Sequence, residues 1–318
     1  MKVQGLFLSL LFAAASHAES TLAIPGFLPP DTKIVIGVQV RALVASPISK
    51  AFAAGLSTNA NAADLLKLTA AIGFNPLSDV DDVLVATTGQ GDNPPTLIVA
   101  HGRFDRLKTD GGVDYHGVQV HESGAKKDSA WAVLDPSTAI AGTPPMVRRA
   151  IDRRSAPSKL DPATLTILNA LRTQYDIWGY GQITPGSLPD AAKQQGLDAL
   201  DRFQFGVNVS QGLQLAATLH MRSTEDGQKL AAGARMLEAM VKSQQPSMQG
   251  AQFDVHTENQ TVKLSLSISQ EEMNKALEAR LHPGSESPMQ PRAEPKPGSI
   301  QKRADGDTMV VTLPGSKR

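Results

Sequence analysis

The sequence predicts an α+β fold in which antiparallel sheets carry helices packed on one face, arranged as two related α+β units. Three observations predict it. Short segments of alternating apolar and polar residues recur along the chain, as is typical of antiparallel strands with one wet face. Helical segments with capping residues separate groups of strands. The order of strand, helical segment, hairpin, further strands and closing helix occurs twice, which favours a duplication.

The first half begins with a strand in residues 31–40, "DTKIVIGVQV", and continues with two short helices in residues 46–73. In residues 81–105, two apolar runs flank the loop "GQGDNPP". A phosphate-binding loop needs consecutive N–H donors at a helix start and, in the P-loop, a Lys, whereas this loop lies between strands and contains two prolines. It therefore predicts a hairpin turn in which Gly89 has a positive φ. Further strands and a helix from Thr143 complete the half.

The second half begins with a helix at Asp161–Pro162, whose leucines face inward, and a strand in residues 176–183. The segments "RFQFGVNV" and "LQLAATLHMR" alternate strictly and predict paired strands with one wet face. A helix after Thr224 is expected to pack on the sheet through Leu230, Ala234, Leu237 and Val241. Two more strands and a helix with a Ser269–Glu272 capping box complete the pattern.

These elements predict four segments: a signal peptide in residues 1–18, a first α+β unit in 19–158, a second in 159–282, and a disordered Pro-rich tail in 283–318. Two short echoes support a duplication, "IGVQV" with "GYGQI" and "TTGQG" with "VSQGL". One continuous antiparallel sheet with helices on one side is the alternative. The tail ends in a strand-like "TMVVTLPG" that could add to the edge of a sheet.

The N-terminus, "MKVQGLFLSLLFAAASHAES", is typical of a cleavable export signal with cleavage after Ala18. Its apolar run is too short for a transmembrane helix. The chain has no cysteine, so it forms no disulfide and has no lipidated cysteine, and the expected location is the bacterial periplasm or the medium. With 31 basic and 31 acidic residues the chain is neutral, which argues against nucleic-acid binding.

No local motif predicts catalysis, a metal site or a cofactor, because the histidines lack metal-ligand spacing and no nucleophile elbow occurs. The most suggestive polar cluster lies on the wet face of the second unit, where residues fall out of phase with the apolar positions of their strands. This face is the candidate binding site, although a merely solvated sheet face would also carry such residues. Its predicted members are His220, Arg222, Asp254 and His256, with Lys263 beside them.

Several stretches resemble exported bacterial proteins of unknown function, of the sort found in acidobacteria. These are "PGFLPPDTKIVIGVQVRALVASPISK", "GFNPLSDVDDVLVATTGQGDNPPTLIVAHGRFD", "YDIWGYG" and "DRFQFGVNVSQGLQLAATLHMRS". The resemblance covers most of residues 25–280. It implies export and architecture and transfers no site residue, because the family is uncharacterised.

The sequence therefore favours a non-enzymatic envelope protein that binds a partner, such as another envelope protein, or a ligand. A periplasmic hydrolase with a motifless active site is the alternative, and His220 and His256 are then the acid–base candidates. A purely structural duplicated domain is the third possibility. The oligomeric state is left open by the sequence.

Overall fold

The computed structural model describes residues 24–47, 49, 74–89, 94–107, 109, 111–123, 128–186, 197–244 and 250–281, without the side chains of 241–244 and 276–281. The predicted signal peptide, most of the predicted helical segment 46–73 and the predicted disordered tail lie outside these residues. The described elements up to Leu277 belong to one compact unit. Within the described ranges, no helix combines the length and the apolar character needed to cross a membrane.

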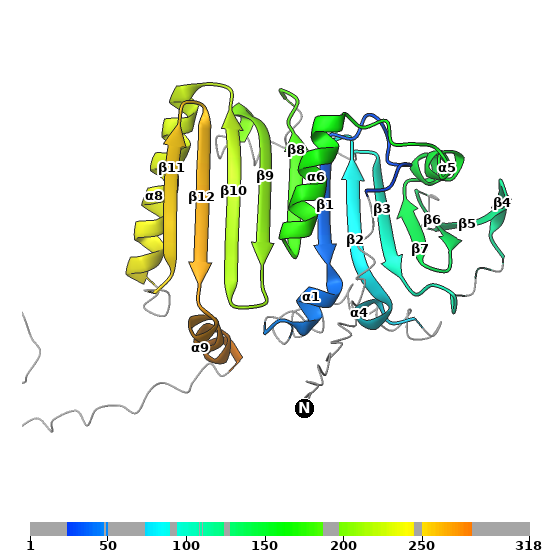
Figure 1. Ribbon diagram of the computed structural model, residues 1–318, viewed down its shortest axis with the longest axis horizontal. Helices are drawn as coiled ribbons and strands as arrows, with labels where there is room; N and C mark the ends of the chain where they lie inside the picture. The colour runs from blue at the N-terminus through cyan, green and yellow to red at the C-terminus, as the bar shows by residue number, and fades with distance from the viewer. Residues whose placement is uncertain are drawn as a thin grey trace, which may run out of the picture. The chain divides into compact units, whose positions relative to one another are not determined.

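The core of the unit is a large antiparallel sheet, which confirms the α+β class (Figure 1). Every strand pair is antiparallel, and the order across the sheet is β11-β12-β10-β9-β8-β1-β2-β3-β7-β6-β5-β4. The strands are β1 Ile34–Gln39, β2 Val80–Thr87, β3 Thr96–Gly102, β4 Val113–Tyr115, β5 Val118–Ser123, β6 Ser129–Asp135, β7 Thr138–Gly142, β8 Ile177–Gln182, β9 Leu200–Asn208, β10 Leu213–Met221, β11 Gln252–Glu258 and β12 Thr261–Ile268.

Helices begin where the sequence supplies caps or prolines. The Asp161 carboxylate accepts a hydrogen bond from the Thr164 N–H at the start of α6. Ser269 and Glu272 form the predicted capping box of α9, with each side chain accepting a hydrogen bond from the other's N–H. The described helices are α1 Val40–Ala45, α4 Pro76–Asp79, α5 Pro144–Asp152, α6 Pro162–Gln174, the 3-10 turn Leu197–Ala199, α8 Thr224–Gln244 and α9 Gln270–Leu281.

The two faces of the sheet are covered by different helices. Leu168 and Leu171 of α6 pack with Trp178 on one face, which we call the α6 face and which also carries Val35 and Leu84. On the opposite face, Ala231 of α8 packs with Val262 and Phe203; this is the α8 face. Figure 1 shows α6 in front of the sheet and α8 behind it. The prediction that the helices pack on one face is therefore corrected.

The orientation of α8 also differs from the prediction. Its helical stripe was expected to bury Leu237, but this side chain is 56% exposed. Gly227 and Ala231 are buried instead. The difference arises because these small residues let the helix backbone lie close to the sheet, so the contact stripe is rotated away from Leu237.

The opening hairpin forms as predicted. Strands β2 and β3 are antiparallel partners, with Thr87 opposite Thr96, and Gly89 has a φ of 65°. The sequence "GQGDNPP" therefore connects two strands of one hairpin, although residues 90–93 lie outside the described part of the chain. The segment "DYHGVQVHE", residues 114–122, forms two strands, β4 and β5, joined by a turn at His116, which has a φ of 53°.

The strand order repeats within the sheet. From the centre of the sheet outward, the first set of strands is β1-β2-β3-β7-β6 and the second is β8-β9-β10-β12-β11. In both sets the fourth and fifth strands exchange places relative to the chain order, and the two sets meet at the antiparallel β1–β8 pair. The pairing is symmetric about Ile36 opposite Gly179. Both sets have a register shift at the same place, where Asp81 is left unpaired in β2 and Asp201 in β9, and the first set has a second shift between Val133 and Asp135 of β6.

Candidate functional site

A row of polar residues crosses the α6 face at one end of the sheet. Cross-strand partners lie on the same face, so the register alone assigns the members of the row. Each neighbouring pair is linked by strand pairing or, at its β1 end, by a 2.9 Å hydrogen bond from the Gln182 N–H to the Lys33 carbonyl. We call this the Arg202 row; it consists of Lys33, Gln182, Arg202, His220, Thr261 and Glu258.

The other half of the sheet has a matching row at the opposite end of β1 and β8. There the Gln39 N–H donates a 2.7 Å hydrogen bond to the Asp176 carbonyl, and strand pairing links the remaining positions. We call this the Asp82 row; it consists of Asp176, Gln39, Asp82, His101, Thr138 and Asp135. Glutamine, histidine and threonine occupy the same places in both rows, whereas Lys33 and Arg202 are replaced by aspartates.

The Asp82 row is closed by α6. The Gln39 amide donates hydrogen bonds to the carbonyls of Arg172 and Tyr175 at the end of that helix, at 3.1 and 3.0 Å. The Asp82 carboxylate lies 3.6 Å from His101 Nδ1. Burial raises the pKa of Asp82, and the charges of His101 and Arg172 only partly oppose that rise. Burial also lowers the pKa of Arg172, so the helix and the row form a partly desolvated charged cluster.

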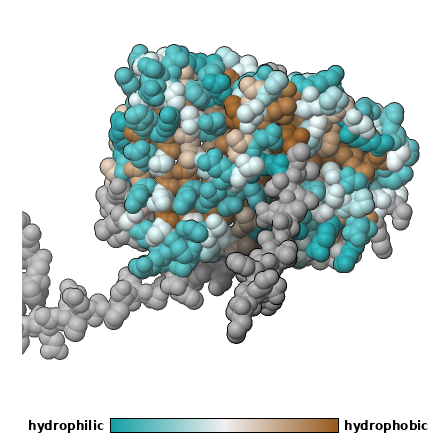
Figure 2. All heavy atoms as spheres, in the orientation of Figure 1, coloured by the Kyte–Doolittle hydropathy of each residue, from teal (hydrophilic) through white to brown (hydrophobic). Residues whose placement is uncertain are grey.

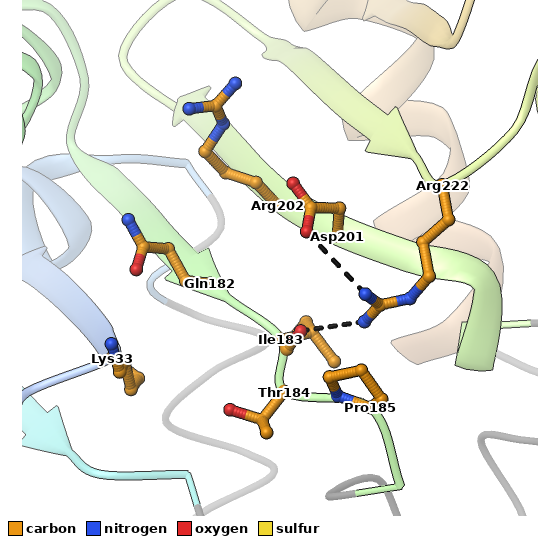
Figure 3. Close-up of a pocket in the computed structure, with 8 residues that line it drawn as sticks. All are labelled: Lys33, Gln182, Ile183, Thr184, Pro185, Asp201, Arg202 and Arg222. Atoms are coloured by element: carbon orange, nitrogen blue, oxygen red, sulfur yellow. Dashed lines mark hydrogen bonds and ion pairs between the residues drawn. The ribbon is translucent and has the colours of Figure 1, made fainter.

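The Arg202 row instead borders a pocket of about 380 Å³, and Figure 3 shows its residues. Arg222 braces one wall: its guanidinium donates to the carbonyls of Ile183 at 2.8 Å and Leu200 at 2.9 Å, and it lies 3.7 Å from Asp201. These interactions commit Arg222 to holding the strand ends together. The lining residues are Lys33, Gln182, Ile183, Thr184, Pro185, Asp201, Arg202 and Arg222.

Two other cationic side chains of the pocket, Lys33 and Arg202, do not make such interactions. Among the described residues, neither the Lys33 ammonium group nor the Arg202 guanidinium has a hydrogen-bond or ion-pair partner. In Figure 3 the Arg202 side chain points away from Arg222, on the side of Gln182. Next to it, His220 Nδ1 lies 3.1 Å from Thr261 Oγ1. Burial lowers the pKa of His220, and the positive charge of Arg202 lowers it further.

The structure separates the four residues predicted as a site into two groups. His220, Asp254 and His256 lie on the α6 face, and His256 pairs with Lys263 of β12. His220 is separated from His256 by β12 and by one row along the strands, so the two histidines are not neighbours. Arg222 follows the end of β10 and reaches the strand ends of the pocket instead of joining the face.

Sequence reasoning missed Arg202 and Lys33, which come from strands other than those of the predicted site. The alternation of "RFQFGVNV" places Arg202 out of phase with the apolar residues of its strand and so could have indicated it. Lys33 required knowledge that β1 and β8 are neighbours. In the described part of the chain, no group of three or more His, Cys, Asp or Glu side chains could hold a metal ion.

Beyond the parts of β8 and β9 that α6 contacts, the α6 face of the second half is polar and carries no described helix. Gln214, Lys263, Ser265 and Asp254 are exposed there. Figure 2 views this face, and hydrophilic side chains predominate over the strands β9 to β12. The α8 helix contacts β10, β11 and β12 on the opposite face.

Comparisons with known proteins do not identify a family. No protein-family model matches the chain, and no curated protein matches it. The solved structures that resemble it include crystal forms III and I of TP0453, each at 11% identity and a TM-score of 0.48. The alignments cover 80% of this chain and 97% or 96% of those chains. Crystal form IV is similar at 10% identity, with the same TM-score. Likeness of this degree carries no argument about function.

Proposed function

We propose that the protein is an exported, non-enzymatic binding protein of the bacterial envelope, and that the α6 face of strands β9 to β12 is its recognition surface. One observation carries this proposal. The α8 helix packs on one side of β10, β11 and β12, and the polar side of these three strands has no described helix over it, whereas α6 lies over β8, part of β9 and the Asp82 row of the first half. In the part of the chain that the structure describes, neither His220 nor His256 forms an ion pair with a carboxylate, and this supports binding more than hydrolysis.

The proposal includes a duplicated origin for the two halves. The repeated strand order, the matching bulges at Asp81 and Asp201 and the matching polar rows support it. Hydrogen bonds repeat too: the Arg103 N–H donates to the Asp79 carbonyl at 2.7 Å, and the Arg222 N–H donates to the Ala199 carbonyl at 2.8 Å. In this account, one half kept its α6 face closed, and the other half left the strands β10 to β12 open for a partner.

A bulky residue in the middle of the open face tests the function. Ser265 is exposed on β12, so Ser265→Tyr should block a docking partner without disturbing the core. Gln228→Tyr on the exposed side of α8 is the matched control, because it adds the same side chain behind the sheet. Crosslinking and co-purification from the native envelope fraction should recover a stoichiometric partner with the wild type and the control, and not with Ser265→Tyr. Equal recovery with all three proteins would refute this surface.

Export is tested separately. The mature protein recovered from outside the inner membrane should begin at Glu19, as mass spectrometry of its N-terminal peptide can show. An intact Met1 on all of the recovered protein would contradict the proposed cleavage.

A further inference from the structure

The comparison of the two polar rows identifies the chemistry of the pocket. In the Asp82 row, a carboxylate faces a cation brought by α6, because Asp82 feels the positive charge of Arg172. In the Arg202 row, the equivalent position carries the cation itself, and no described helix supplies a carboxylate to it. A negatively charged group next to Arg202 would therefore complete the second row as Arg172 completes the first.

The pocket has the groups that an oxyanion requires. Arg202 supplies a planar guanidinium, which can donate two parallel hydrogen bonds to a carboxylate or phosphate. Lys33 supplies a second cation two strands away, and the Gln182 side chain lies between them in the row. Because the charged groups of Arg202 and Lys33 have no partner among the described residues, an anion would displace no ion pair of these residues.

The acidic group in the pocket is already engaged. Among the described lining residues, Asp201 is the only carboxylate, and it lies 3.7 Å from Arg222. Backbone carbonyls hold the Arg222 guanidinium in place, so the Asp201–Arg222 pair stabilises the side of the pocket and is not available to a ligand. The local charge that remains for a ligand comes from Lys33 and Arg202.

We propose that Lys33, Gln182 and Arg202 form a binding site for the oxyanion of a small molecule, a carboxylate or a phosphate. This inference rests on the proposed binding function and gives a ligand class to the pocket that borders the recognition surface. The anion occupies the place that corresponds, in the first half, to the contact between the Asp82 row and α6. His220, the next residue of the row, lies beside the bound anion and reports on it.

The test uses the full chain and two probes, citrate for carboxylates and inorganic phosphate for phosphates, each titrated at low ionic strength by calorimetry. At least one probe should bind, and Arg202→Gln should weaken its binding at least tenfold. Lys263→Gln is the matched control, because it removes an exposed cation from the same face outside the pocket. It should leave the affinity within twofold of wild type. Asp201→Asn removes a negative charge from the wall and should tighten binding.

A second measurement needs no variant of the pocket. Titration of the wild-type protein with the same probe should shift the NMR signals of the His220 ring and leave those of the His256 ring unchanged. If neither probe binds, or if Arg202→Gln and Lys263→Gln weaken binding equally, the site does not exist as proposed. Loss of the partner in Ser265→Tyr together with no anion binding would overturn only this inference and leave the proposed function standing.

Discussion

A glycine at the junction of the two halves provides the sharpest test of the packing. Gly37 of β1 lies opposite Trp178 of β8, and the indole ring packs over the glycine. A Cβ at residue 37 would lie 2.2 Å from Trp178 Cε2 and 2.4 Å from Cζ2. The ring is only 2% exposed and is surrounded by the core, so it has little room to move. Gly37→Ala should therefore destabilise the protein.

The magnitude follows from two opposing effects. Overpacking of a buried contact costs about 1–3 kcal/mol. Replacement of a glycine inside a strand gains about 0.5–1 kcal/mol, because the unfolded chain loses conformational freedom. The expected net loss of unfolding free energy is about 1–2 kcal/mol. Urea denaturation followed by far-ultraviolet circular dichroism measures it.

Two variants make this prediction refutable. Gly233→Ala on α8 is the matched control, because no atom lies within 4 Å of its added Cβ, and it should gain about 0.5–1 kcal/mol. Trp178→Phe removes the indole atoms nearest to residue 37, so Gly37→Ala should cost less in that background. If Gly37→Ala raises the urea midpoint as the control does, or if the two substitutions are additive, the close packing at the junction is wrong.

Three further predictions concern the polar rows and a helix cap. Arg202→Gln should raise the pKa of His220, measured by NMR, because the Arg202 charge is one of the causes that lower it. In the wild type, His220 is protonated in the unfolded chain before it is protonated in the folded protein as the pH falls below about 6.5, so the unfolding free energy decreases there. The unfolding free energy of Arg202→Gln should decrease less over the same pH range, because its His220 pKa is closer to that of the unfolded chain. Asp82→Asn should be at least as stable as wild type at pH 7. Because the pKa of Asp82 is raised in the folded state, ionisation of this carboxyl at rising pH lowers the unfolding free energy of the wild type, and asparagine does not ionise. If the variant instead loses stability relative to wild type between pH 4 and pH 7, the ion pairs of Asp82 dominate. Ser269→Ala should cost about 1 kcal/mol at the start of α9, seen as faster amide exchange at Glu272, and unchanged exchange would mean that the capping box contributes nothing.

The elements of this fold could be predicted because each has a local physical cause. Strict alternation identified the strands β9 and β10, and the stripe of Met146, Val147, Ala150 and Ile151 is fully buried in α5 as its spacing indicates. The arrangement of the helices could not be predicted in this way. Both faces of the central strands carry apolar residues, such as Val35 on one side and Ile34 on the other, so alternation does not say which helix covers which face.

The polar rows depend on pairings that are distant in the sequence. The echo "IGVQV" with "GYGQI" corresponds to the register that relates β1 to β8, whereas "TTGQG" with "VSQGL" is displaced by two or three residues from the pairing seen in the hairpins. With that displacement, His101 does not align with His220, and the match between the two rows is lost. The predicted site rested instead on the phase of polar residues along their own strands, and it did not include Arg202 of β9.

The two rows also separate what the sheet needs from what its surface can vary. In both halves, the residue that follows the bulged aspartate pairs with a histidine of the next strand, and this histidine pairs with a threonine. Asp82 pairs with His101 and Arg202 pairs with His220. The threonines are Thr138 and Thr261. This part repeats whether or not a helix lies above it, so packing against α6 does not explain it. The charge beside the histidine does differ between the halves, and it is negative where an arginine of α6 is near and positive where the pocket is open. Electrostatic complementarity explains both charges: the negative Asp82 faces an arginine of α6, and the positive Arg202 would face a bound anion.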